Sequence, residues 1–168
     1  DIGDFRYRRY QKVLDVEFPV EGNPAVGHTA SYVRRQRGDE VVFATAFVTV
    51  YEKPTSLVAE VRDRLATLGT YEVEVGALEG EHVWWLDGGS DRWALWVSGR
   101  HVVKLGAPPG AEIPEELAEA YTDLYPSDLD ARGFARDGAA SAGPSRRQAE
   151  EEGESYELPR HLREGAPR

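Results

Sequence analysis

The stretch HVWWLDGGSDRWALWV, residues 82–97, decides the fold of this chain. All four tryptophans lie in it, on either side of a central DGGSD turn: Trp84, Trp85, Trp93 and Trp96. Two runs of aromatic and branched residues around such a turn predict a β-hairpin. A turn symmetric about Gly89 would place Trp85 opposite Trp93 on one face, with Trp84 and Trp96 diagonal to each other on the other. We therefore expect both faces of this hairpin to be covered and the hairpin to form the centre of the core.

The regions around the hairpin predict further strands and two helices. Alternation of apolar residues predicts an edge strand at 12–20, which Pro19 keeps at the edge, two strands at 29–36 and 41–52, and a meander of strands at 71–77, 82–86, 92–97 and 101–105. Apolar residues at helical spacing predict a helix over 57–68 and a second one between Pro114 and Pro126. One face of the 41–52 strand carries small residues, so we expect the 57–68 helix to pack on it. The fold class is thus α+β, a mostly antiparallel sheet of about five to seven strands with two helices packed on it and an extended C-terminal tail.

Composition and charge limit the number of domains and the partners. A chain of 168 residues with 40% hydrophobic content fits one core. The seven acidic and seven basic side chains of residues 131–168 cancel, so the net charge of −10 lies on residues 1–130. An acidic body repels phosphate backbones and anionic lipid headgroups, and we predict no nucleic-acid partner. No apolar run approaches the roughly 20 residues of a membrane-spanning helix, which predicts that the sequence does not cross a membrane.

The sequence contains no cysteine and no methionine, and it begins at Asp1. The first absence excludes disulfides and thiolate chemistry within this stretch. The missing start residue predicts a segment upstream of Asp1, for which a signal peptide or a membrane anchor is one explanation. We therefore expect an extracytoplasmic location, on the periplasmic or cell-surface side, with the cytoplasm as the alternative.

A change of composition near residue 131 predicts two parts, a sheet domain at 1–130 and a polar extended tail at 131–168. Gly, Ala and Ser dominate residues 133–144, and such a sequence is disordered unless it is bound to a partner. Apolar and basic residues at the end of the tail are the predicted contacts with other protein subunits: Tyr156, Leu158, Arg160, Leu162 and Arg163.

Three functions are compatible with these patterns. The first is a non-catalytic accessory subunit of a larger assembly, membrane-associated or not, which docks through its tail and its sheet. The second is a binding module in which a groove lined by tryptophans holds a sugar, a lipid or a pigment. The third is a small hydrolase or isomerase that uses His82 and His101, which flank the hairpin. We predict the first, without enzymatic activity, cofactor or metal.

Overall fold

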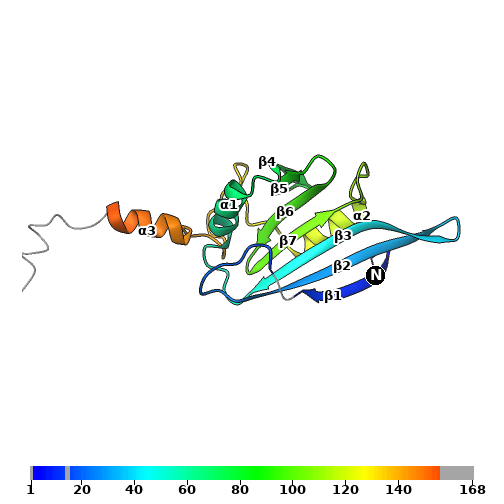
Figure 1. Ribbon diagram of the computed structural model, residues 1–168, viewed down its shortest axis with the longest axis horizontal. Coiled ribbons are helices and arrows are strands. Elements are labelled where there is room, and N and C mark those ends of the chain that lie inside the picture. Colours follow the sequence, from blue (N-terminus) through cyan, green and yellow to red (C-terminus); the bar gives the residue numbers. More distant parts are fainter. Residues whose placement is uncertain (1, 14–15, 156–168) are drawn as a thin grey trace, which may run out of the picture.

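The computed structural model describes residues 2–13 and 16–155, with side chains for all of these except 7–13 and 152–155. It contains a seven-stranded antiparallel sheet with two helices packed on it, which confirms the predicted α+β class (Figure 1). The strands are β1 (Arg6–Val13), β2 (Ala25–Gln36), β3 (Asp39–Tyr51), β4 (Glu72–Leu78), β5 (Glu81–Asp87), β6 (Arg92–Ser98) and β7 (His101–Gly106), and the helices are α1 (Leu57–Thr67), α2 (Glu115–Leu124) and α3 (Arg146–Ser155). The strand order in space is β1-β2-β3-β7-β6-β5-β4.

The first strand lies earlier in the chain than predicted. The edge strand is β1 (Arg6–Val13), and Pro19 lies outside it in a loop. Phe18 of this loop is buried, and its carbonyl oxygen accepts a hydrogen bond from the Tyr51 hydroxyl. Phe18, one of the apolar residues that suggested a strand, therefore anchors the loop onto the end of β3.

The tryptophan hairpin forms as predicted, but its register differs by one residue. Trp84 pairs with Leu95, Trp85 with Ala94 and Leu86 with Trp93, so Trp85 and Trp93 point to opposite faces. The connection has four residues, 88–91, and its centre falls between Gly89 and Ser90 rather than on Gly89. A shift of one residue moves each side chain to the other face. Trp84 and Trp96 still cover both faces, since each is at most 2% exposed.

The two helices cover opposite faces of the sheet. Tyr121 of α2 lies against Tyr32 of β2, and the Trp96 indole donates a hydrogen bond to the Tyr125 carbonyl oxygen, so α2 covers the face that carries Ala46 and Trp96. Helix α1 contacts β6 and covers the other face, as Figure 1 shows. The prediction that the 57–68 helix packs on the small residues of β3 is wrong, because α2 takes that position. We call these two surfaces the α2 face and the α1 face.

The folded part of the chain extends past residue 130, beyond the predicted start of the tail. Asp128 accepts hydrogen bonds on Oδ2 from the Gly99 amide at 2.7 Å and from the Ser141 hydroxyl at 2.6 Å. Gly133 lies so close to Trp84 that an added Cβ would approach the indole nitrogen to 2.7 Å. Ser141 and Ser145 are fully buried. Residues 133–145 therefore belong to the sheet domain, because small side chains allow close packing over the α1 face.

Candidate functional site

An apolar groove runs between α2 and the strands β2 and β3 on the α2 face. We call it the tyrosine groove. Its main part has a volume of about 540 Å³ and is lined by residues of three segments: Ile2, Tyr32, Val48, Ala120, Tyr121, Asp123, Leu124 and Tyr125. A second part of about 390 Å³ shares Tyr32, Val48 and both helix tyrosines and continues along β2 and β3 to His28 and Val50. A further hollow of about 420 Å³ continues from His28 and Val50 to Glu52. The three hollows adjoin through the residues that they share, so the tyrosine groove is one open channel along β2 and β3.

Small side chains in the sheet create this groove. Ala30 of β2 pairs directly with Ala46 of β3, and the next pair on the same face of the sheet is His28 with Val48. The two alanines leave space beneath α2, and the helix fills only part of it. Leu124, at the end of α2, is 69% exposed beside the groove. The groove is thus an apolar surface that the described residues leave open.

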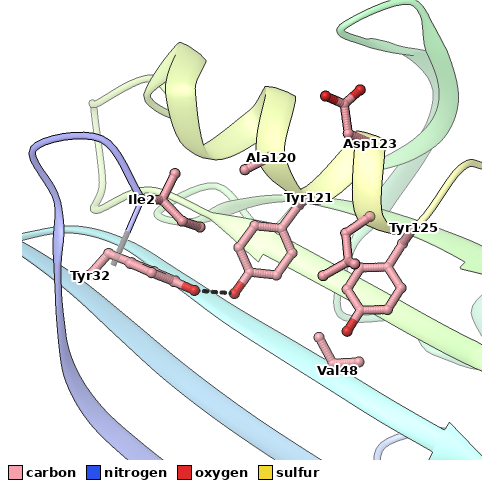
Figure 2. Close-up of a pocket in the computed structure, with 8 residues that line it drawn as sticks. Ile2, Tyr32, Val48, Ala120, Tyr121, Asp123 and Tyr125 are labelled. Atoms are coloured by element: carbon pink, nitrogen blue, oxygen red, sulfur yellow. Dashed lines mark hydrogen bonds between the residues drawn. The ribbon is translucent and has the colours of Figure 1, made fainter.

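A row of aromatic rings forms one wall of the groove. The Tyr32 and Tyr121 rings pack edge to face with centroids 6.0 Å apart, Tyr121 stacks on Tyr125 at 6.3 Å, and Tyr125 lies 5.1 Å from the His101 ring. Figure 2 shows the hydrogen bond between the Tyr32 and Tyr121 hydroxyls and the Tyr125 ring above Val48. Burial raises the pKa of Tyr125, with a smaller contribution from Tyr32. Burial lowers the pKa of His101, with a smaller contribution from the charge of Arg100. Both rings are therefore uncharged near neutral pH.

One carboxylate lies at each end of the groove, Asp123 beside α2 and Glu52 at the far end. Helix α2 carries no basic residue, and its exposed side chains include Glu115, Glu116, Glu119 and Asp123. The Asp123 carboxylate points away from the tyrosines in Figure 2, toward solvent. At the far end the channel reaches Glu52, which is also exposed. An apolar floor with an acidic rim favours a ligand that combines apolar groups with positive charge.

The tryptophans do not form the groove that the second function requires. Trp84 and Trp96 are buried, and Trp85 lines a smaller cavity of about 250 Å³ with Leu78 and Ile113. The Arg92 guanidinium lies 4.0 Å from the centre of the Trp85 ring and covers it. This cavity offers less apolar surface than the tyrosine groove.

A second cluster surrounds Lys104 on the α1 face. Its ammonium lies 3.0 Å from a Glu17 carboxylate oxygen, 4.7 Å from the Trp93 ring centre and 5.4 Å from that of Phe47. Asp91 accepts a hydrogen bond from the Trp93 indole at 2.8 Å, and this bond lowers the pKa of the Asp91 carboxyl. The charges of this cluster are compensated within the chain, so it fastens the loop before β2 to the sheet.

The two histidines of the third function are not brought together. His82 lies on β5 and His101 on β7, with β6 between them. Through the pairings of β6 with both neighbours, His101 shares a face with Trp96, and His82 points to the opposite face, which also carries Trp84. His101 packs on Tyr125, whereas His82 is exposed. The geometry therefore gives no shared acid–base site to this pair.

The predicted partner contacts Tyr156, Leu158, Arg160, Leu162 and Arg163 lie outside the described residues. Within residues 2–13 and 16–155, no cluster of three or more His, Asp and Glu side chains has a geometry that could hold a metal ion. The helices of the same ranges include none with the length and hydropathy of a transmembrane helix. The structure thus leaves the tyrosine groove as the candidate site.

The sequence contains two signals for this groove, which our predictions did not combine. The small residues on one face of 41–52 indicate where a helix packs, and Tyr121 and Leu124 lie in the apolar stripe of the second predicted helix. Only the tertiary structure shows that this helix, and not the first, covers those small residues.

No family model, no curated protein sequence and no solved structure matches the chain.

Proposed function

We propose that this protein is a non-catalytic interaction subunit and that its tyrosine groove binds an extended segment of a protein chain. The observation that carries the proposal is the open apolar channel between α2 and the β2–β3 pair, bounded by Asp123 at one end and Glu52 at the other. Exposed apolar surface of this kind with a polar rim is typical of protein interaction sites.

The geometry favours an extended segment for two reasons. The channel follows the direction of β2 and β3, so alternate side chains of a bound strand would point into it. Tyrosine rings supply large contact areas with little loss of conformational entropy, which suits them to binding surfaces. The preferred ligand then has two or more apolar side chains flanked by Arg or Lys.

Display of random twelve-residue peptides tests this function. We expect the protein to enrich peptides that combine spaced apolar residues with Arg or Lys. Leu124→Arg should remove this enrichment, because it places a positive charge beside the groove without disturbing the core. Val73→Arg is the matched control, since Val73 is a 41% exposed apolar residue on β4, far from the groove in the strand order. Equal enrichment by both variants, or none by the unaltered protein, would contradict the proposal.

A small apolar molecule is the second candidate ligand. The main part of the groove, at about 540 Å³, falls within the range of about 300 to 1,000 Å³ that small-molecule sites occupy. A sugar, lipid or pigment would then bind on tyrosines rather than on tryptophans. Titration with Nile red distinguishes this function: a saturable rise in fluorescence that Leu124→Arg or Val48→Glu abolishes supports it, and an unsaturable or unchanged signal contradicts it.

The predicted extracytoplasmic location is a separate part of the proposal. Fractionation of cells that express the complete natural protein, with detection by an antibody to the sheet domain, tests it directly. Recovery in the cytoplasmic fraction would contradict it and would leave the groove function unaffected.

A further inference from the structure

The end of the chain has the chemistry that the tyrosine groove favours. Residues 158–163 read Leu-Pro-Arg-His-Leu-Arg, with two leucines, two arginines and no acidic residue. We propose that this segment of a second copy of the chain occupies the tyrosine groove. The inference rests on the proposed function, because it names the protein segment that the groove binds.

The spacing of the two leucines fits the length of the groove floor. Leu158 and Leu162 are four residues apart, which is about 13 Å in an extended chain. The floor of the groove along β3 runs from Ala46 to Val50, also four residues of extended strand. Pro159 disfavours a helical backbone at Leu158, so the sequence favours the extended form that this fit requires. Both leucines of one segment can therefore contact the floor at once.

The charges of the segment and of the rim are complementary. Arg160 and Arg163 belong to the segment, whereas Asp123 lines the groove beside α2 and Glu52 lies at its other end. An extended segment that places its leucines on the floor turns Arg163 away from it, toward the rim. Arg160 lies between the leucines on the same face, so its aliphatic stem would rest on the floor while its guanidinium reaches toward the rim. Exposed ion pairs of this type add modest affinity and make the association sensitive to salt.

The position of α3 favours a second copy over the same chain. The amide of Arg146 donates to Glu60 of α1 and its guanidinium pairs with Glu21, so the start of α3 is attached to the domain. The helix then runs away from the sheet in Figure 1. Its ten residues span about 15 Å. Leu158 follows Ser155 by three residues, which reach back at most about 11 Å. Leu158 therefore cannot return even to the start of α3, and the two leucines cannot lie together in the groove of their own chain.

Such an exchange gives a closed dimer. Each copy supplies one segment and one groove, and a twofold axis relates the two contacts. No other surface is needed, and α3 acts as the arm that carries each segment to the partner copy.

Sedimentation velocity of the full-length protein over a concentration series tests this assembly. We expect the unaltered protein and Val73→Arg to form a dimer. The tail variant Leu158→Asp/Leu162→Asp and the groove variant Leu124→Arg should each weaken association at least about tenfold, as loss of a central contact does. An equimolar mixture of these two variants should regain association, because one retains the groove and the other retains the segment. Val48→Glu serves as a second groove variant, and circular dichroism verifies that each variant is folded.

Three results would overturn the inference. They are a monomeric unaltered protein at every concentration, a tail variant that dimerises like the unaltered protein, and a mixture that associates no better than its components. None of these results changes the outcome of peptide display. Peptide display therefore tests whether the groove binds protein segments, and sedimentation tests separately whether the tail of a second copy is the segment that it binds. Recovery in the mixture supports the inference, since no other interface predicts complementation between a tail variant and a groove variant.

Discussion

The hydroxyl groups of Tyr32 and Tyr121 lie 2.6 Å apart, and this hydrogen bond joins β2 to α2 at the edge of the tyrosine groove. Residues 89 positions apart in the sequence thus hold the helix at a fixed distance from the sheet. The groove is therefore a preformed feature of the fold, whose width depends on this contact.

Tyr121→Phe should destabilise the protein by about 1 kcal/mol, because it leaves the buried Tyr32 hydroxyl without this partner. Urea denaturation followed by tryptophan fluorescence measures the change. Tyr125→Phe is the control, since the Tyr125 hydroxyl makes no hydrogen bond with the part of the chain that the structure describes, and its effect should be under about 0.5 kcal/mol. Equal losses in the two variants would show that the hydrogen bond does not fix the helix.

Ser141→Ala should cost about 1 to 3 kcal/mol, because the buried Asp128 carboxylate then loses one of its donors. Ser90→Ala, in the exposed turn of the tryptophan hairpin, should be close to neutral. Thermal denaturation compares the two. If Ser141→Ala were equally neutral, residues 133–145 would not be part of the cooperative fold.

Gly106→Ala should destabilise the protein by about 1 to 3 kcal/mol, because its Cβ would approach the Trp93 ring to 2.5 Å. Gly69→Ala is the matched change, with no atom within 4 Å of the added Cβ. It should be neutral or stabilising by up to about 1 kcal/mol, through its effect on the unfolded chain. A neutral Gly106→Ala would contradict the packing of Trp93 on β7.

Burial, with a smaller contribution from Arg100, lowers the pKa of His101 from 6.5. Below that unfolded pKa the unfolded chain binds a proton more readily than the folded chain, so stability falls as the pH drops toward the folded pKa. The loss of stability between pH 7.5 and pH 5 should therefore be smaller in His101→Gln than in the unaltered protein. Urea midpoints at the two pH values measure the difference, and an equal loss in both would contradict the packing of a neutral His101 on Tyr125.

The sequence was sufficient for the fold class, for β2 to β7 and for the two packed helices, because alternation and helical spacing are local. It misplaced β1, and it predicted an extended tail where the structure has helix α3. Leu57, Val58, Val61 and Leu65 predicted α1, and the alternation of β3 predicted one small and one aromatic face. The register of the tryptophan hairpin was not predictable in the same way. The DGGSD sequence is compatible with a turn centred on Gly89 and also with the observed four-residue connection centred between Gly89 and Ser90. That single residue decides which face each tryptophan covers.

The tyrosine groove depends on contacts that no local pattern encodes. Tyr32, Val48 and Tyr125 come from three separate elements, and only the path of the chain brings them together. The folded state of residues 133–145 was hidden for a similar reason. A stretch rich in Gly, Ala and Ser is typical of disorder, but here its small residues allow backbone to pack against Trp84 and beside Asp128.

A photo-reactive benzoylphenylalanine in place of Leu124 tests the central claim most directly, because this side chain lies at the groove and is 69% exposed. The same group in place of Phe134, an apolar residue that is 42% exposed and follows Gly133 at the α1 face, is the control. In the full-length protein we predict that irradiation joins position 124 to residues 156–163 of a second copy, as mapped by mass spectrometry, and that position 134 gives no such product. If position 124 gave no intermolecular product, or the same products as position 134, the groove would not be the surface through which this protein attaches to its partner.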